Sequence, residues 1–289
     1  MKNKIIVEEA GRKLSDIKKI IIHPGSAHRD DFLATGLAIY LTSSNIEVER
    51  KEPSKEELGN SQILVLDVGG RHEPELKNFD HHQFPSDTSE CAFSIFSQWL
   101  KLEHLFKIYD WYEVTKIWDS QGPKALADYL NFPTHPPVNP FESSLTGLIR
   151  DNKLKNWHKL AGEIMGYFVE RSVEILDIRI PWFRKNSEVK TVAGMNILVA
   201  DSPNTKGIGE YEQELLIKEN IKIDAEIWPD NRGDGWRLMR LDDNSSINFR
   251  KLNGEPAMRF IHANGFTAST KEKISLNEIL VLMEKSITL

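Results

Sequence analysis

The sequence has almost no cysteine. Of its 289 residues only Cys91 is a cysteine, which excludes an intrachain disulfide and favours a reducing compartment. The chain also lacks any run of the ~20 apolar residues that a membrane-spanning helix needs, and its N-terminus lacks the apolar stretch of a signal peptide. We therefore expect a soluble, cytoplasmic protein that does not contact a membrane.

An excess of positive charge is absent as well. The net charge is −6, whereas proteins that coat nucleic acid unspecifically are usually basic. Hydrophobic residues make up 40% and charged residues 28% of the chain, which is typical of a globular protein and argues against disorder. The charge therefore weakens the hypothesis of unspecific nucleic-acid binding, and the composition predicts a folded protein.

Apolar segments alternate with a helical pattern near the N-terminus. Residues 18–22 and 63–68 are nearly continuous apolar runs, residues 46–50 alternate, and residues 31–41 place apolar side chains at helical spacing. This order predicts an α/β fold with a parallel sheet in the N-terminal domain.

The pattern changes after residue 188. It predicts a smaller α+β domain with a final helix over 276–285 and short strands at 190–193, 195–200, 221–228, 236–241 and 246–249. The length agrees with two domains. We expect a catalytic domain over 1–150, a helical linker over 151–187 and a C-terminal domain over 188–289.

Three segments place histidine and aspartate where an apolar strand meets a turn. These are IIHPGSAHRDD with His23, His28, Asp30 and Asp31, then VLDVGG with Asp67, and FDHHQ with Asp80, His81 and His82. Histidine and aspartate together usually coordinate divalent transition metals. In parallel sheets, bound molecules and ions lie beyond the carboxyl ends of the strands. A single histidine or aspartate at the end of a strand is more often a capping or surface residue than a functional one. Three such segments together are hard to explain by structural roles alone.

These motifs resemble the DHH phosphoesterase superfamily, whose name describes residues 80–82. Within it the sequence is most similar to the melanocyte-proliferating-gene (Myg-type) nucleases and their bacterial relatives. Those proteins carry a His-x-Gly-x-x-His-x-Asp-Glu loop, here residues 23–31 with Asp31 in place of the glutamate. They also carry Asp-Val-Gly-Gly, here 67–70, and a C-terminal aromatic-Val-His-Ala-x-Gly-Phe stretch, here 260–266.

The resemblance implies a metal-dependent phosphodiesterase that hydrolyses RNA or short oligonucleotides as an exonuclease. Two divalent ions, Mn²⁺ or alternatively Mg²⁺, would activate the attacking water. The substrate would be short and single-stranded and would lie between the two domains.

The resemblance also assigns roles to residues. The metal ligands would be His23, His28, Asp30, Asp67, His81 and Asp119, with Asp67 bridging the two ions. His82 would face the phosphate as a catalytic residue, and Asp80, the second catalytic position, would orient His81. The expected substrate contacts in the C-terminal domain are Arg250, His262, Asn264 and Gly265.

Several alternatives stay open at this point. Asp31 competes with Asp30 as a ligand, and Asp110 competes with Asp119. Arg29 is unusual in its loop and either contacts a phosphate or lies at the surface. One alternative function is hydrolysis of a small phosphoester or phosphoanhydride, such as a cyclic dinucleotide or pyrophosphate. The other is a catalytically inactive module that binds a metal or a nucleotide. The sequence leaves the oligomeric state open, a homodimer included.

Overall fold

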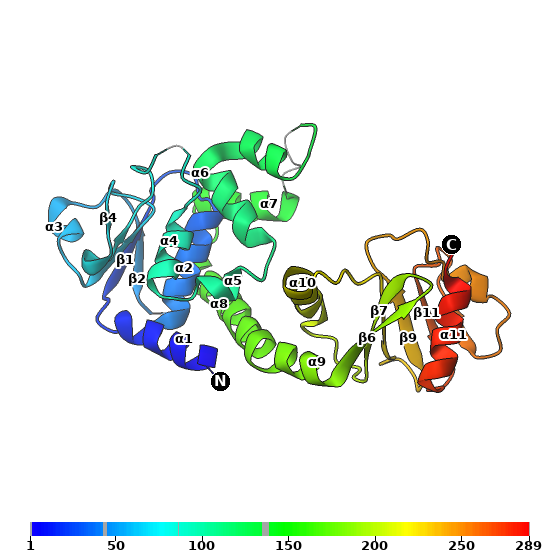
Figure 1. Ribbon diagram of the computed structural model, residues 1–289. Coiled ribbons are helices and arrows are strands. Elements are labelled where there is room, and N and C mark those ends of the chain that lie inside the picture. The colour runs from blue at the N-terminus through cyan, green and yellow to red at the C-terminus, as the bar shows by residue number, and fades with distance from the viewer. Residues whose placement is uncertain (1, 43–44, 86, 135–138, 289) are drawn as a thin grey trace. The chain divides into compact units, whose positions relative to one another are not determined.

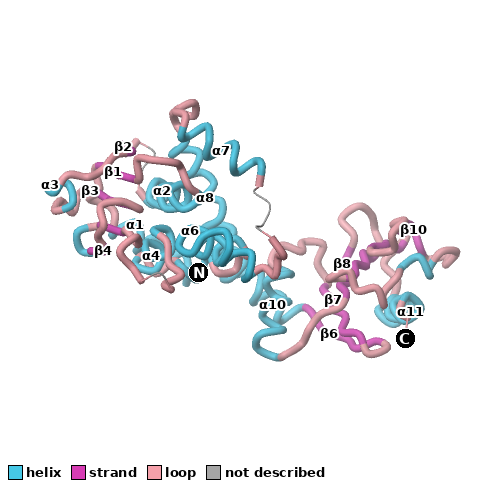
Figure 2. Tube along the Cα trace, turned by 90° about the horizontal axis from the view of Figure 1, so that it is seen from above, coloured by secondary structure: helices cyan, strands magenta, loops and turns pink. Residues whose placement is uncertain are grey.

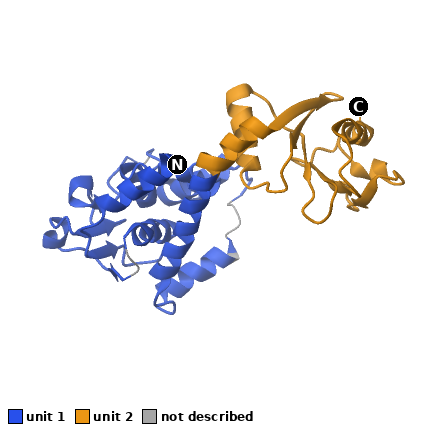
Figure 3. Ribbon diagram, turned by 90° about the horizontal axis from the view of Figure 1, so that it is seen from below, with its two compact units in different colours: residues 1–174 blue, residues 175–289 orange. Residues whose placement is uncertain are grey.

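The computed structural model describes residues 2–42, 45–85, 87–134 and 139–288 of the chain. The protein forms two compact units, Met1–Glu174 and Ile175–Leu289 (Figure 3). The boundary between them falls inside the segment 151–187 that the sequence analysis treats as a linker, and the three-part division stays a prediction. No helix in the described ranges is long and apolar enough to cross a membrane.

Unit 1 is built on a five-stranded sheet with the strand order β2-β1-β3-β5-β4. Strands β1, β2 and β4 of this sheet are labelled in Figure 1. The strands are β1 (Lys19–Ile22), β2 (Glu47–Arg50), β3 (Ile63–Leu66), β4 (His72–Glu73) and β5 (Asn78–Phe79). The first four in the sheet order run parallel and β4 pairs antiparallel with β5 at the edge. The predicted α/β fold with a parallel sheet is therefore confirmed, although β4 and β5 were not predicted.

Helices cover both faces of this sheet. They are α1 (Lys2–Lys13), α2 (Arg29–Leu41), α3 (Lys55–Leu58), α4 (Ala92–Trp99), α5 (Glu103–Phe106), α6 (Trp111–Tyr129), α7 (Pro140–Arg150) and α8 (Trp157–Glu174). On one face Ile21 and Val65 pack against Leu58 of α3, while α2 and α4 contact the sheet strands. Strands covered on both faces bury their side chains, which explains why the last three residues of β1 and all four of β3 are apolar.

The strand register aligns the ends of three strands. Ile22 of β1 is paired with Leu66 of β3, and Leu66 is paired with Phe79 of β5. Because all three strands run in the same direction, the next residue of each one leaves the sheet at the same edge. These residues are His23, Asp67 and Asp80.

Helices α2 and α8 lie side by side at very short range (Figure 2). A Cβ atom built on Gly36 of α2 would lie 2.5 Å from the backbone oxygen of Ala161, and one built on Gly162 of α8 would lie 2.5 Å from Cγ2 of Ile39. Only glycine allows the two helices to approach this closely. The contact buries α2 almost completely, so this helix is not amphipathic.

Unit 2 contains a six-stranded sheet with the order β10-β11-β9-β8-β7-β6. The strands are β6 (Ser187–Val192), β7 (Met195–Ala200), β8 (Ala225–Pro229), β9 (Trp236–Arg240), β10 (Met258–Ile261) and β11 (Thr267–Thr270). Its helices are α9 (Ile180–Asn186), which follows a π-helical turn over Ile175–Arg179, α10 (Ile208–Glu219) and α11 (Leu276–Ser286). The predicted α+β class of this part is confirmed.

One predicted strand of unit 2 is wrong. Residues 246–249 form no strand: Ile247 makes a single bridge to Ile287, and a 3-10 helix, η3 (Phe249–Leu252), begins directly after it. Strands β10 and β11 were missed. The sequence of β11 is Thr-Ala-Ser-Thr, which has no apolar pattern, yet the strand is fully buried. Its polar side chains can be buried because hydroxyl groups such as that of Thr267 donate to carbonyls inside the sheet, here that of Leu238.

Two carboxyl groups meet inside unit 2. Glu212 of α10 and Glu226 of β8 form a pair, and Glu226 is only 2% exposed. Burial and the neighbouring Glu226 raise the pKa of Glu212 to about 10. Burial also raises the pKa of Glu226. The folded protein therefore keeps a proton on this pair at neutral pH.

We expect Gly36→Ala to lower the free energy of unfolding by about 1–3 kcal/mol, since the new methyl group has no room against α8. Gly147→Ala on α7 is the matched control, because its nearest neighbour would be an Arg150 side-chain nitrogen at 3.9 Å. This control should be neutral or more stable by about 0.5–1 kcal/mol. Urea unfolding measures both, and equal effects at the two sites would contradict the close helix contact.

The Glu212 carboxyl predicts a pH dependence of stability. The unfolded side chain ionises near its ordinary pKa of 4.5, whereas the folded side chain ionises only near pH 10. The contribution of the Glu212 carboxyl to the free energy of unfolding is therefore fully present below pH 4.5, and it declines as the pH rises toward 10. We expect Glu212→Gln to stabilise the protein by about 1–3 kcal/mol at pH 8 and to flatten this decline. Chemical unfolding at pH 5, 7 and 9 tests this pH dependence. The exposed Glu219→Gln variant is the control. If the stability of Glu212→Gln and of wild type changed in parallel with pH, the prediction would be refuted.

Candidate metal centre

The first histidine loop is held by an arginine from the neighbouring strand. Arg50, the last residue of β2, donates to the backbone oxygen of His23 at 3.1 Å and to that of Gly25 at 2.6 Å. The parallel pairing of β1 and β2 brings this side chain beside the loop. Arg50 was not predicted, because its only signal in the sequence is a cationic residue at the end of a predicted strand.

The start of α2 buries two carboxylates in different ways. Asp31 Oδ2 accepts from the backbone N–H of His28 at 3.0 Å, which leaves Asp31 Oδ1 buried without a hydrogen bond. Asp30 instead accepts from Ala92 N at 3.0 Å and Phe93 N at 2.8 Å, the first residues of α4. These N–H groups have no partner within their own helix and carry the positive end of its dipole, so they fix the Asp30 carboxylate in place.

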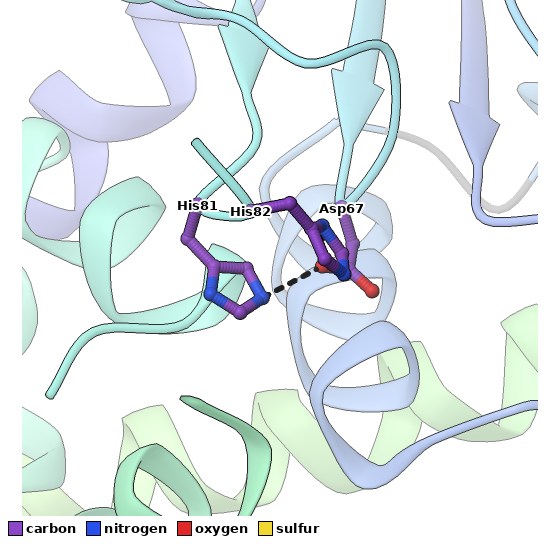
Figure 4. Close-up of side chains that lie close together, drawn as sticks. All are labelled: Asp67, His81 and His82. Carbon is purple, nitrogen blue, oxygen red and sulfur yellow. Dashed lines mark ion pairs between the residues drawn. The ribbon is translucent and has the colours of Figure 1, made fainter. Parts of the chain in front are cut away.

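Asp67 occupies a strained backbone position directly after β3. Its φ of 58° lies in the left-handed region, which aspartate tolerates better than most residues but which still costs free energy. Its N–H donates to Phe79 O at 3.0 Å, and its side chain is buried. Oδ1 lies 3.1 Å from Nε2 of His81, whose ring is directed at it (Figure 4).

Asp80 holds His82 and not His81, which corrects the expectation from the family resemblance. Asp80 Oδ1 lies 2.7 Å from His82 Nδ1 and accepts from His82 N, while Oδ2 accepts from Gly70 N at 2.6 Å. Burial works against ionisation of Asp80, but these hydrogen bonds outweigh it and hold its pKa below the usual range. The side chain of His82 remains 57% exposed.

Asp119 joins the cluster from α6. Its Oδ2 lies 2.9 Å from Nε2 of His81, and its Oδ1 lies 3.8 Å from Nδ1 of His28. Three residues later Gly122 has φ 81° and ψ −179°, so the helix is kinked there. Asp110 precedes the helix, is exposed and takes no part in the cluster. Of the two alternatives, the geometry therefore favours Asp119.

The described residues contain three sets of side chains whose ligand atoms lie within 4.8 Å of one another. Every set contains Asp67. The sets are Asp30, Asp67, His81 and Asp119; His28, Asp31 and Asp67; and Asp67, His81 and His82. Thus Asp30 and Asp31 both lie beside Asp67, each in a different set, and the role of either residue as a ligand stays a prediction.

His23 takes part in none of these sets. Its ring stacks on His28 with centroids 5.7 Å apart and lies 6.5 Å from His82, and its Nδ1 is buried without a hydrogen bond. Its role as a ligand stays a prediction.

The cluster fits a divalent cation. Asp67 Oδ1 and His81 Nε2 are buried and close together, yet they make no hydrogen bond of acceptable geometry. Ligands at right angles around one ion, each about 2.1 Å away, stand about 3 Å apart, which matches the spacings around His81. Burial and the repulsion of neighbouring carboxylates raise the pKa of both Asp30 and Asp31. Bound cations would remove this repulsion.

His81 responds to the same carboxylates. Burial disfavours its charged form, but Asp119 and Asp67 outweigh burial and raise its pKa to about 10. A positive charge is therefore strongly favoured between these carboxylates, whether it is carried by a proton on His81 or by a metal ion.

The predicted substrate contacts of unit 2 lie around one turn. The loop after β10 is closed by His262 Nδ1, which accepts from Asn264 N at 3.1 Å, and Gly265 O accepts from Phe249 N at 3.0 Å. A Cβ built on Gly265 would lie 3.2 Å from Cγ of Arg250. The structure thus brings Arg250, His262, Asn264 and Gly265 together within unit 2, and their contact with a substrate stays a prediction.

Comparison with known proteins confirms the family resemblance for the part that carries the motifs. Residues 19–94 match the family described as "MYG1_exonuc: Uncharacterised protein family (UPF0160)". This segment contains all three histidine and aspartate motifs, from His23 to His82. No curated protein matches the chain.

Two solved structures of other proteins are weakly similar. RecJ from Thermus thermophilus, in complex with Mn²⁺, is 15% identical with a TM-score of 0.29 over 97% of this chain. The chain spans about half of RecJ, 54% of its length. PggH, a pGpG-specific phosphodiesterase from Vibrio cholerae, is 10% identical with a TM-score of 0.28, over 93% of this chain and 99% of PggH. At such scores neither likeness supports a conclusion about this chain.

We expect Asp67→Asn to abolish stabilisation by Mn²⁺ while leaving the metal-free protein as stable as wild type or more stable. Asparagine accepts the left-handed backbone of this position, and it removes one of the repelling charges. A ligand at 100 times its dissociation constant stabilises a protein by about 2.7 kcal/mol. Affinity should fall by at least the ~10–100-fold that changes around metal ligands cost.

Thermal unfolding with and without Mn²⁺, together with calorimetric titration, measures both effects. Asp110→Asn is the control, since that carboxylate lies outside the cluster. Equal Mn²⁺ affinity of Asp67→Asn and wild type would remove Asp67 from the metal centre.

Proposed function

We propose that the protein is a metal-dependent phosphoesterase that hydrolyses RNA or short oligonucleotides from a chain end, with two divalent ions, preferably Mn²⁺. The observation that carries this proposal is that two ligand sets share Asp67, because adjacent sets joined by one carboxylate suit a pair of ions. The matched family is named for an exonuclease, which supports nuclease activity. The acidic net charge of −6 favours a short substrate.

Two bound ions would neutralise the phosphate charge and lower the pKa of the attacking water. Asp30, His81 and Asp119 would hold one ion together with Asp67, and His28 and Asp31 would hold the other together with Asp67. His23 lies beside the second set. Arg50 keeps the loop of His23 in place through its two backbone contacts.

His82 is the proposed contact to the phosphate. Asp80 binds its Nδ1, which orients the ring and favours a proton on that nitrogen. When both ring nitrogens carry a proton, the exposed ring would donate from Nε2–H to a phosphate oxygen or to the leaving oxygen. We also propose that Arg250, His262, Asn264 and Gly265 of unit 2 contact the substrate.

We expect Mn²⁺-dependent release of mononucleotides from a short labelled RNA, and at least a ~100-fold lower rate for Asp119→Asn. This substitution keeps the size of the side chain but removes a charge from the set that holds His81. The assay compares short RNA, short DNA and pyrophosphate with each metal, and Asp110→Asn serves as the matched control.

Each outcome of the assay assigns a function. Cleavage of pyrophosphate alone would replace the proposal by a phosphoanhydride hydrolase. No cleavage of any substrate by protein that still binds Mn²⁺ would replace it by a silent metal-binding module.

A further inference from the structure

A cavity of about 390 Å³ opens directly beside the metal centre within unit 1. Three residues of the ligand sets, His28, Asp30 and Asp119, line one end of it. The remaining lining comes from Ala27 and Arg29 at the start of α2, from α6, from Leu130 and Phe132 after it, and from the beginning of α7. The cavity therefore lies next to the position that the proposed function assigns to the phosphate.

The wall away from the metal ligands is apolar and partly aromatic. It is formed by Trp118, Leu126, Leu130 and Phe132. Trp118 is 39%, Leu130 37% and Phe132 45% exposed, so these large side chains contact solvent when the cavity holds no ligand. Covering such surfaces with a flat apolar group would be favourable, whereas a phosphate alone gains nothing from them.

The kink of α6 builds this wall. Trp118 and Asp119 precede Gly122, and Leu126 and Leu130 follow it. Because the backbone at Gly122 is not helical, the segments on its two sides run in different directions and both line the same cavity. One helix thus supplies a metal-cluster carboxylate and the apolar wall together.

Arg29 does not offer a free charge to the cavity. Its guanidinium makes a two-pronged ion pair with Glu142 of α7, with Nε 2.8 Å from Oε1 and Nη2 in contact with Oε2. It also donates to Thr115 Oγ1 at 3.4 Å. The ion pair of Arg29 and Glu142 is neutral overall and joins α7 to the start of α2. Arg29 therefore provides no free positive charge in the cavity that could bind a second phosphate.

We infer that this cavity binds the base of the nucleotide whose phosphate is at the metal centre, and that it selects nucleoside phosphoesters over inorganic phosphoanhydrides. The inference rests on the proposed function and deepens it. A base is flat and apolar on its faces, as the wall requires, and it stacks on aromatic side chains regardless of its identity. At the low end of the ~300–1,000 Å³ found for small-molecule sites, the cavity suits one nucleoside and excludes a duplex.

The test compares a dinucleotide with an analogue that lacks the base of the nucleoside at the scissile phosphate. Wild type should cleave the complete dinucleotide about 5- to 100-fold more efficiently in kcat/KM, the range expected for loss of one stacked base. Phe132→Ala should reduce this preference several-fold, and Trp118→Ala should do the same. Tyr129→Ala is the matched control, because this aromatic side chain is 55% exposed at the end of the same helix but does not line the cavity.

A binding measurement keeps the inference separate from the activity. Calorimetric titration with AMP and with ribose 5-phosphate, in the presence of Mn²⁺, should show tighter binding of AMP to wild type and a smaller difference in Phe132→Ala. Equal affinity of wild type for the two ligands, or an equal loss in Phe132→Ala and Tyr129→Ala, would overturn the inference. Cleavage of both dinucleotides at the same rate would overturn it while leaving the proposed function intact. If neither is cleaved, the proposed function fails, and the titration still decides whether the cavity binds a base.

Discussion

Carboxylates that are buried next to one another repel, and unit 1 holds several of them in contact. Backbone N–H groups bind two of these carboxylates, Asp30 at the start of α4 and Asp80 at Gly70, while strand pairing holds the backbone of Asp67. Because these groups belong to packed secondary structure, the side chains cannot turn outward to relieve the repulsion. Protons or a bound cation must therefore offset the repulsion, as the raised pKa values of Asp30, Asp31 and His81 indicate.

The sheet and the helices contribute to this centre differently. The common register of β1, β3 and β5 sets His23, Asp67 and Asp80 in a row, so the sheet supplies fixed positions. The helices supply carboxylates from their ends and bends, with Asp31 at the start of α2 and Asp119 before the kink of α6. A centre made in this way depends on the packing of α2 and α8, where glycine allows the close contact.

Much of the N-terminal part was predictable from the sequence, because β1 and β3 are buried on both faces and are therefore continuously apolar. Histidine and aspartate directly after such strands identified the metal centre. Local pattern failed for β11, whose buried Thr and Ser residues are satisfied by neighbouring strands. The family resemblance assigned Asp80 to His81, whereas the turn after β5 brings His82 back to the Asp80 carboxylate.

The sequence by itself determined which ligand types are present, their order and their position after the strands, since these follow from strand periodicity and the motifs. Only the tertiary structure decided that Asp30 and Asp31 join different ligand sets, that Asp119 and not Asp110 reaches His81, and that Arg29 pairs with Glu142. The physical reason is that neighbouring residues share a local pattern but point in different directions. Which of them reaches a common centre depends on helix orientation and on contacts between residues far apart in the chain.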